Sequence, residues 1–186
     1  MPGMPGWVGR TLGKASVELL LARDESGEVY LGRHRGLQCA VALMIFDGLP
    51  ADDAFAFATF QCDAVNLSTL KNPRIAAVLE SSRADGYAYL VLEYVPGTSL
   101  ASHLKALSAT QRILDAEKIS RILNDAFEGK IFSHKRGVIH RALRPSSILL
   151  PKPLHRLKPE SPIHTTCTLC LRILPCRDRL MRGWRV

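Results

Sequence analysis

The sequence lacks the features of an exported or membrane-spanning protein. No uninterrupted apolar run is long enough to cross a bilayer. Prolines and glycines at positions 2, 3, 5, 6 and 9 break up the first ten residues, which leaves no apolar core of signal-peptide length. The five cysteines are an odd number and do not form the framework of a secreted protein. The sequence therefore predicts a cytoplasmic protein with reduced thiols.

Acidic residues are scarce in one part of the chain only. The 186 residues carry a formal net charge of +8. Residues 1–150 contain 17 basic and 15 acidic residues, whereas residues 151–186 contain 8 basic and 2 acidic ones. Because this basic tail has no aromatic stacking platform apart from Trp184, only nonspecific electrostatic contact with nucleic acid is expected. We expect no specific nucleic-acid partner and no membrane partner.

Five apolar segments have the residue types and lengths of β-strands. They lie at 16–21, 28–32, 39–46, 77–79 and 87–94. Polar turns at 24–27 and 81–86 separate neighbouring strands, and this spacing is typical of hairpins. The pattern predicts an antiparallel sheet in the first half of the chain.

Two segments carry apolar residues at helical spacing. Pro50, Asp52 and Asp53 are a helix-start signal, and the apolar residues that follow are Phe57, Phe60, Ala64 and Leu67. Asp115 is predicted to cap a second helix. The apolar residues of this helix form an amphipathic stripe: Ile119, Ile122, Leu123, Ala126, Phe127 and Ile131.

Residues 138–150 resemble the catalytic loop of protein kinases, in which His-Arg-Asp is followed after four further residues by Asn. His140 and Arg141 keep the start of this motif. The aspartate that accepts the substrate proton falls on Ala142, and the asparagine that holds magnesium falls on Ser147. Arg144 lies between these two altered positions. A methyl group cannot accept a proton, so the resemblance implies a kinase-like scaffold without its catalytic base.

The phosphate-binding parts of the family are also altered. The glycine-rich loop, G-x-G-x-x-G-x-V, falls on a stretch that begins at Ala22 and keeps only the third glycine, Gly27. Asp24 and Glu25 would place carboxylates where the family binds polyphosphate. An exposed acidic hairpin turn is the alternative interpretation of this stretch.

A third altered position lies in the strand that resembles the family's V-A-x-K strand. Met44 replaces the lysine that holds the α- and β-phosphates, and a methionine has no charge to offer. Counting back from the turn 72–75 places Asp63 at the glutamate that pairs with this lysine. Without that lysine, Asp63 is expected on a solvated helix face.

Residues 89–100 resemble the last N-lobe strand, the hinge and the entry to the next helix. The resemblance implies that backbone groups of Glu93 and Val95 would face the edge of an adenine, with Leu92 behind it. The vestigial pocket that it implies consists of Val29, Ala42, Leu92, Glu93, Val95 and Leu149. The alternative is an ordinary core of strand and loop residues.

The resemblance implies an α+β fold with a kinase-like N-lobe, that is, a five-stranded antiparallel sheet plus one helix, and the first helices of a truncated C-lobe. We expect a flexible N-terminus at 1–15, the N-lobe at 16–95, the hinge, two helices and the catalytic-loop segment at 96–150, and a tail at 151–186 that does not resemble a kinase. A change of reading frame or a different exon would explain the tail.

The tail offers a separate metal hypothesis. Four side chains have the chemistry of zinc ligands: His164, Cys167, Cys170 and Cys176. Their spacing matches no zinc-binding pattern, so incidental cysteines are the favoured interpretation, and no metal is expected.

Three functional hypotheses remain open. The first is a catalytically inactive pseudokinase-like fragment that binds a protein partner, or a second copy of itself, through the apolar stripe at Ile119, Ile122, Phe127 and Ile131. The second is a divergent Ser/Thr kinase that holds its nucleotide through the adenine pocket alone. The third is a gene remnant without activity. We expect at most weak adenine binding and no magnesium.

Overall fold

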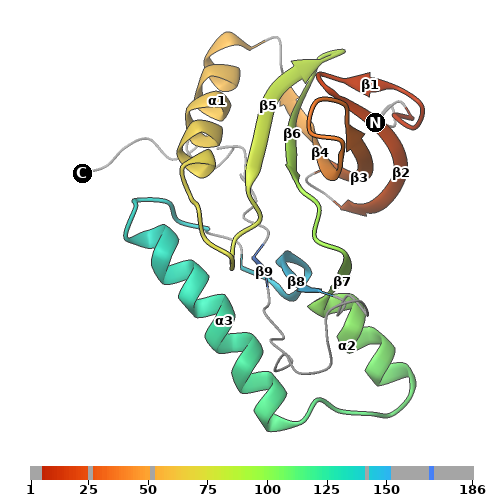
Figure 1. Cartoon of the computed structure of the whole chain (residues 1–186), viewed down its shortest axis with the longest axis vertical. Helices are drawn as coiled ribbons and strands as arrows, with labels where there is room; N and C mark the ends of the chain where they lie inside the picture. The colour runs from red at the N-terminus through yellow and green to blue at the C-terminus, as the bar shows by residue number, and fades with distance from the viewer. Residues whose placement is uncertain (1–5, 25–26, 51–52, 141–142, 152–167, 170–186) are drawn as a thin grey trace. The chain divides into compact units, whose positions relative to one another are not determined.

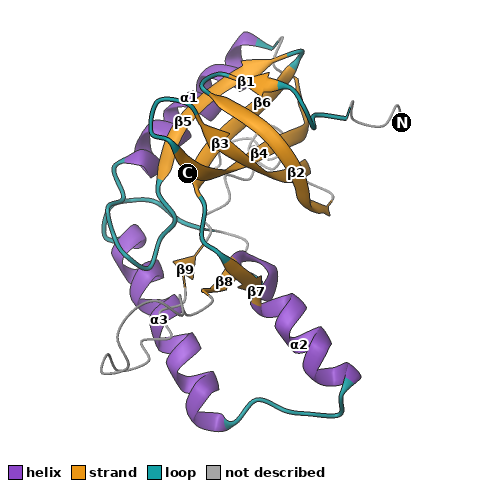
Figure 2. Ribbon diagram, turned by 45° about the vertical axis from the view of Figure 1, so that its right-hand side comes forward, coloured by secondary structure: helices purple, strands orange, loops and turns teal. Residues whose placement is uncertain are grey.

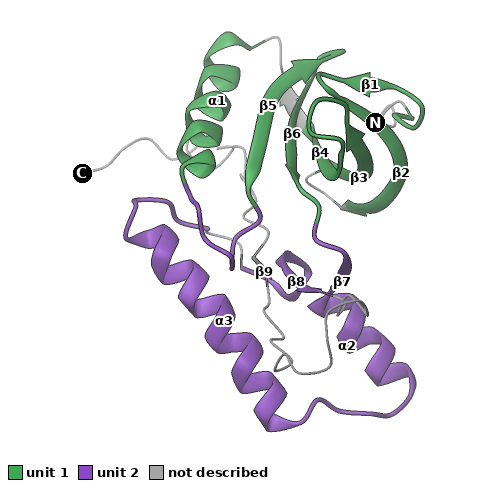
Figure 3. Cartoon of the chain, viewed as in Figure 1, with its two compact units in different colours: residues 1–69, 77–94, 173–186 green, residues 70–76, 95–172 purple. Residues whose placement is uncertain are grey.

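A computed structural model describes residues 6–24, 27–50, 53–140, 143–151 and 168–169. The chain divides into two compact units, which Figure 3 shows in different colours. Unit 1 comprises residues 1–69, 77–94 and 173–186, and unit 2 comprises residues 70–76 and 95–172. The zinc hypothesis falls on His164, Cys167, Cys170 and Cys176, which lie outside the described residues.

Unit 1 contains an antiparallel sheet of six strands in the order β1-β2-β3-β4-β6-β5 (Figure 1). The strands are β1 Thr11–Leu12, β2 Ala15–Asp24, β3 Gly27–His34, β4 Cys39–Pro50, β5 Val78–Ala84 and β6 Tyr87–Glu93. The five predicted strands are therefore present, and β1 adds a short edge strand. The turn expected at 81–86 is tighter than predicted, because β5 continues to Ala84 and leaves only Asp85 and Gly86, both with positive φ, to reverse the chain.

The alternation of side chains along β4 gives the sheet two apolar faces. Val41, Leu43 and Ile45 are fully buried on one face, in a cluster with residues of β2, β3 and β6. Phe46 lies on the other face and makes an edge-on contact with Phe60 of α1 Ala54–Ser68, with ring centroids 5.5 Å apart. The helix α1 contacts β4 and β5 (Figure 2).

The cap of α1 confirms the predicted start signal. Oδ1 of Asp53 accepts hydrogen bonds from the backbone N–H groups of Phe55 and Ala56 at 3.0 and 3.1 Å. These bonds satisfy two of the N–H groups that the first turn of a helix leaves without an intrahelical partner. The helix therefore begins directly after Asp53.

Residues 7–15 correct the expectation of a flexible N-terminus at 1–15 for the part of it that the structure describes. Trp7, Leu12 and Ala15 are each at most 2% exposed and belong to the core cluster on the β4 face described above. Thr11 and Leu12 pair with Ser16 and Ala15 of β2. Sequence alone did not reveal this, because the glycines and prolines around Trp7 are typical of a loose end, whereas the indole is held by the sheet.

A buried carboxylate lies in the same core. Glu28 of β3 is 2% exposed, forms an ion pair with Arg23 and accepts a 2.7 Å hydrogen bond from the hydroxyl of Tyr30. Burial, together with this hydrogen bond to Glu28, raises the pKa of Tyr30 above its ordinary value of 10.0. The hydroxyl is therefore kept protonated as the donor to the carboxylate.

This contact gives a pH-dependent prediction for Tyr30→Phe. At neutral pH the variant should be less stable by about 1–3 kcal/mol, since it leaves a buried carboxylate with one hydrogen bond fewer. Because the folded pKa of Tyr30 lies above its unfolded value, the Tyr30 contribution is complete below pH ~10 and is lost as the pH rises through the folded pKa. The stability difference between the two proteins should therefore shrink in alkali.

Urea denaturation of both proteins at a series of pH values from neutral to alkaline measures this difference. Tyr89, whose pKa is also raised by burial, is present in both proteins and cancels in the comparison. A difference that is constant across the whole pH range would contradict the assignment.

Unit 2 consists of two helices and a small sheet. The helices are α2 Leu100–Ala109 and α3 Ala116–His134, and the sheet has the order β7-β8-β9, with β7 Gly97–Ser99, β8 Ile148–Pro151 and β9 Thr168–Leu169. A short 3₁₀ turn, Pro145–Ser147, precedes β8. The core of the unit is formed by Leu100, Ile122, Ala126 and Ile148.

The predicted cap of α3 is confirmed, because Oδ1 of Asp115 accepts from the N–H groups of Glu117 and Lys118. Across the described ranges, no helix combines the length and the apolar character that a membrane span needs.

Candidate functional site

The hairpin β2–β3 holds the stretch that corresponds to a phosphate-binding loop. Its register pairs Ala22 with Val29 and Asp24 with Gly27, so only two residues connect the strands. Gly27 has a φ of +141°, and a Cβ there would collide with the carbonyl oxygen of Ile45 on β4. This glycine is thus required by the close approach of two strands. Glu25 lies outside the described residues.

The next altered position, Met44, is a core residue. Its side chain is 3% exposed on β4, between Val29 of β3 and Leu90 of β6 in the strand register. Asp63 is partly buried on α1. A thioether carries no charge, so Met44 cannot neutralise a phosphate and cannot form an ion pair with this carboxylate.

The apolar residues assigned to an adenine pocket are divided between the two units. In unit 1, Val29 on β3 and Ala42 on β4 share the sheet face of Met44, and Ala42 pairs with Leu92 of β6, which is 2% exposed. In unit 2, Val95 precedes β7, and Leu149 lies on β8 opposite Ser99. Val29, Ala42, Val95 and Leu149 are partly buried.

The hinge residue Glu93 has one backbone group already engaged. Its N–H donates to the carbonyl oxygen of Ala77 at 2.8 Å, and its carboxylate accepts from the N–H of Ala77 at 3.4 Å. Any contact between the Glu93 backbone and an adenine would therefore have to use the Glu93 carbonyl oxygen. The sequence resemblance implied only that backbone groups of Glu93 would face an adenine, without saying which. The structure leaves the carbonyl oxygen as the candidate, since the N–H is bonded to Ala77.

The loop that resembles the catalytic loop is held by hydrogen bonds of its own. The hydroxyl of Ser147 donates to the carbonyl oxygen of Arg144 at 2.8 Å and accepts from the N–H of Arg144 at 3.0 Å. Ser147 is 3% exposed. His140, which begins the motif, is also buried, whereas Arg144 is exposed. Ala142 lies outside the described residues.

These contacts show what Ser147 does in the structure. Its hydroxyl closes the short 3₁₀ turn by bonding both backbone groups of Arg144, and burial separates it from solvent. Magnesium is bound by oxygen ligands that face an open, hydrated position. In this conformation the Ser147 side chain is a structural cap.

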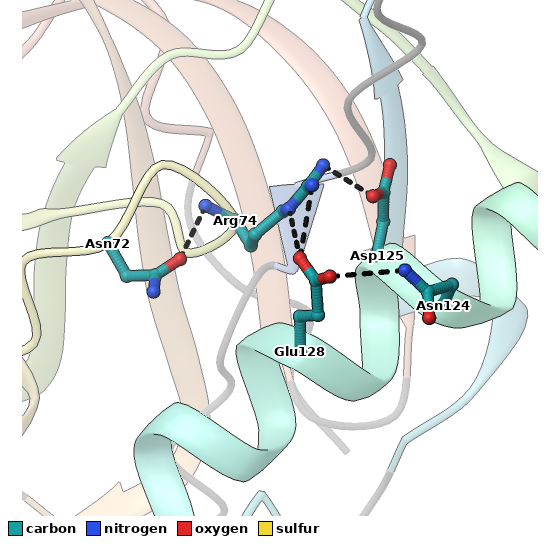
Figure 4. Close-up of polar contacts among 5 residues, drawn as sticks. All are labelled: Asn72, Arg74, Asn124, Asp125 and Glu128. Carbon is teal, nitrogen blue, oxygen red and sulfur yellow. Dashed lines mark hydrogen bonds and ion pairs between the residues drawn. The ribbon is translucent and has the colours of Figure 1, made fainter.

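An ion-pair network that was not predicted lies elsewhere in unit 2 (Figure 4). Nη1 of Arg74 is 2.5 Å from Oδ1 of Asp125, and Nη2 and Nε are each 3.1 Å from Oε2 of Glu128. Asn72 accepts the backbone N–H of Arg74 at 2.8 Å, and Asn124 donates to the other oxygen of Glu128 at 3.1 Å. Residues 70–76 are thereby fastened to α3.

One sequence signal for this network was present. Asp125 follows Ile122 by three positions and precedes the buried Ala126, so a carboxylate falls on the inward face of an amphipathic helix. A charge at such a position calls for a partner, because an unpaired buried carboxylate is costly. Arg74, 51 positions earlier in the chain, could not be chosen as that partner without the fold.

The apolar stripe of α3 divides into an inner and an outer row. Ile122 is 5% exposed and packs in the core of unit 2, which corrects its assignment to an exposed surface. The outer row recurs at every fourth residue, and each member is between 42% and 54% exposed: Ile119, Leu123, Phe127 and Ile131. The stripe is therefore too wide for one apolar core, and the outer row stays in contact with solvent.

A protein kinase domain model matches residues 18–158, which is most of the chain and covers parts of both units. The chain belongs to the protein kinase family. The elements come in the order that the sequence resemblance implied. They are the β2–β3 hairpin, β4, α1, the hinge strand β6 and the loop before β8.

Curated kinases and solved kinase domains agree with the family model. The chain is 30% identical over 151 residues to the serine/threonine-protein kinase pkn3 of Myxococcus xanthus, covering 80% of this chain and 27% of that protein. It is 30% identical over 127 residues to the serine/threonine-protein kinase PknB of Mycobacterium tuberculosis, covering 66% of this chain and 20% of that protein.

The crystal structure of a mutant PknI kinase domain from Mycobacterium tuberculosis superposes with a TM-score of 0.71 at 25% identity, covering 80% of this chain and 59% of that domain. The kinase-like α+β fold is thereby confirmed. The match covers 59% of this solved kinase domain and between 20% and 27% of the length of these two curated relatives.

Proposed function

We propose that this kinase-family chain does not transfer phosphate and acts by binding a protein partner. The observation that carries the proposal is the double hydrogen bond between Ser147 and Arg144, because it occupies the side chain at the family's magnesium position. Met44, buried on β4, removes the phosphate-binding cation, and Ala142 removes the base. Loss of a general base alone lowers the rate by about 10²–10⁴.

The outer row of α3 supports the binding half of the proposal. Four large apolar side chains at one face of a helix form a surface of the kind that protein partners cover. The row comprises Ile119, Leu123, Phe127 and Ile131.

A second candidate is a divergent Ser/Thr kinase that binds a nucleotide through its adenine. The observation in its favour is that Val29 and Ala42 share one apolar face of the β3–β4 pair, next to Leu92. Hydrophobic contact with a base does not require Met44 or Ser147. This candidate therefore predicts that both adenosine and ATP bind. Our proposal predicts that the phosphates of ATP add nothing to the affinity for adenosine.

Thermal unfolding with adenosine, with ATP and with magnesium-ATP separates the two candidates. A ligand at 100 times its dissociation constant stabilises a protein by about 2.7 kcal/mol, which such an experiment detects readily. We expect magnesium-ATP to raise the melting temperature no more than adenosine at equal concentration. A clear preference for ATP that depends on magnesium would contradict the proposal.

Phosphotransfer is measured in parallel, with the PknB kinase domain as the positive control. The unmodified chain should label neither itself nor a basic protein substrate, and Ala142→Asp alone should not restore labelling, because Met44 and Ser147 remain. Labelling that depends on magnesium and disappears in the Arg144→Ala variant would overturn the proposal. Labelling that this variant leaves unchanged comes from a contaminating kinase.

A further inference from the structure

A groove in unit 2 runs between α2, the loop after it and α3. Its volume is about 590 Å³, within the range of natural binding pockets. Leucines and isoleucines make up most of its lining, chiefly Leu100, Leu104, Leu107, Ile113, Ile119 and Leu123. Ile119 and Leu123 also belong to the outer row of α3, so the groove opens onto the proposed partner surface.

The apolar residues at the mouth of the groove are unusually exposed. Ile113 is 91% exposed, and Leu104 is 39% exposed on the facing side of α2. An isoleucine in contact with water on almost all sides contributes nothing to the packing of this unit. Its placement beside a concave apolar surface indicates a helix-sized partner rather than a small polar ligand.

The charges around the groove are positive. Within residues 100–124 the two acidic side chains are already paired, Asp115 with Lys118 and Glu117 with Arg121. Lys105 on α2 and Arg112 at the groove have no ion-pair partner in the part of the chain that the structure describes. Arg112 lines the groove, and Lys105 follows the lining residue Leu104 on α2, so the charges of this segment without an ion-pair partner among the described residues are positive.

These charges distinguish between the occupants that the groove could take. In the chain's own tail, Thr168 and Leu169 already pair with β8, and residues 151–186 carry 8 basic and 2 acidic residues, a charge that does not complement Lys105 and Arg112. A second copy that docked through its unit 2 would bring described residues that include 10 basic and 4 acidic ones. A flat anionic membrane has the right charge but cannot enter a concave groove.

We propose that the groove binds an amphipathic helix of another protein, with apolar side chains at i, i+3 or i+4, and i+7 and with acidic residues on its flanks. The apolar side chains fill the space between α2 and α3, and the acids lie near Lys105 and Arg112. This inference rests on the proposed partner-binding function and specifies the partner's chemistry.

Three labelled peptides of about 15 residues test the inference by fluorescence anisotropy on the full chain. The first has leucines at the stated spacing and glutamate flanks, the second has the same leucines with lysine flanks, and the third has the glutamates with scrambled leucine positions. In about 0.01 M salt, where screening is weak, we expect the first to bind at least about tenfold more tightly than either of the others. The margin over the lysine peptide should largely disappear in about 1 M salt.

Variants then locate the binding site. Ile113→Ser should weaken binding of the glutamate peptide by about tenfold, since a large apolar side chain loses its contact. Arg112→Glu should weaken it by about three- to tenfold at low salt. Val65→Ser is the matched control, because Val65 is a 61% exposed residue of α1 in the other unit and should leave binding unchanged.

Several outcomes would overturn the inference. Three concern the peptides: the glutamate peptide does not bind, it binds no more tightly than the lysine peptide, or its binding is unchanged in Ile113→Ser. The inference is also overturned if the chain sediments as a dimer that Ile113→Ser dissociates, or if the chain binds anionic phospholipid vesicles but not the glutamate peptide. The glutamate peptide could fail to bind while magnesium-ATP neither stabilises the chain nor leads to labelling. The chain is then an inactive kinase relative with a different partner. If the peptide binds and labelling is seen, the groove is retained and the proposal of inactivity falls.

Discussion

Replacing Trp7 by alanine should destabilise the chain by about 3–5 kcal/mol, the range for removing a large aromatic side chain from a packed core. Trp7 is 0% exposed, contacts Tyr87 edge-on with ring centroids 5.5 Å apart and lies under the guanidinium of Arg10 at 5.2 Å. A single domain has a total stability of about 5–15 kcal/mol, so this loss is a large fraction of it. Urea denaturation followed by circular dichroism measures the effect.

Val8→Ala is the matched control for this experiment, because the neighbouring side chain is 57% exposed. Its effect should stay within about 0.5 kcal/mol. Trp7→Leu keeps part of the apolar contact and gives a measurable value if the alanine variant does not fold. A cost below about 1 kcal/mol for Trp7→Ala would show that the first residues do not belong to the core.

The second large effect is expected for the Arg74 network. Arg74→Met removes the guanidinium that pairs with Asp125, whose side chain is 11% exposed, and should cost about 1–3 kcal/mol. A double-mutant cycle with Asp125→Asn should give a coupling energy above about 1 kcal/mol, since the pair is shielded from solvent. Denaturation of the four proteins in urea provides the cycle.

The pair Arg121–Glu117 on the same helix is the control for this cycle. Both side chains are more than half exposed, and exposed pairs four residues apart on a helix contribute about 0.3–0.5 kcal/mol. Coupling of Arg74 to Asp125 that is no larger than in this control would mean that the network is an ordinary surface contact. It would then not be what holds residues 70–76 against α3.

The elements that sequence predicted are those whose signals are local. The strand at 39–46, the helix-start signal at Asp53 and the cap Asp115 each involve neighbours within a few positions, and the structure confirms them. The order of the motifs was sufficient to identify the family, because several weak patterns at matching distances constrain one another.

The features that sequence missed depend on contacts distant in the chain or on orientation. Trp7 is buried by strands that follow it, so its own neighbours gave no sign of this. Spacing placed Ile122 on the apolar stripe of α3 but could not tell whether it faced inward. Comparison with the kinase motif identified Ser147 as altered, yet the two bonds to Arg144 depend on the path of the backbone.

The bonds of Ser147 also bear on which residues this position tolerates. Ser147→Asn would replace the hydroxyl that makes two hydrogen bonds, each contributing about 0.5–1.5 kcal/mol, by a larger side chain in a buried site. That substitution alone would leave Met44 and Ala142 unchanged. We therefore expect the buried turn to disfavour asparagine at position 147 as long as its present bonds to Arg144 are kept.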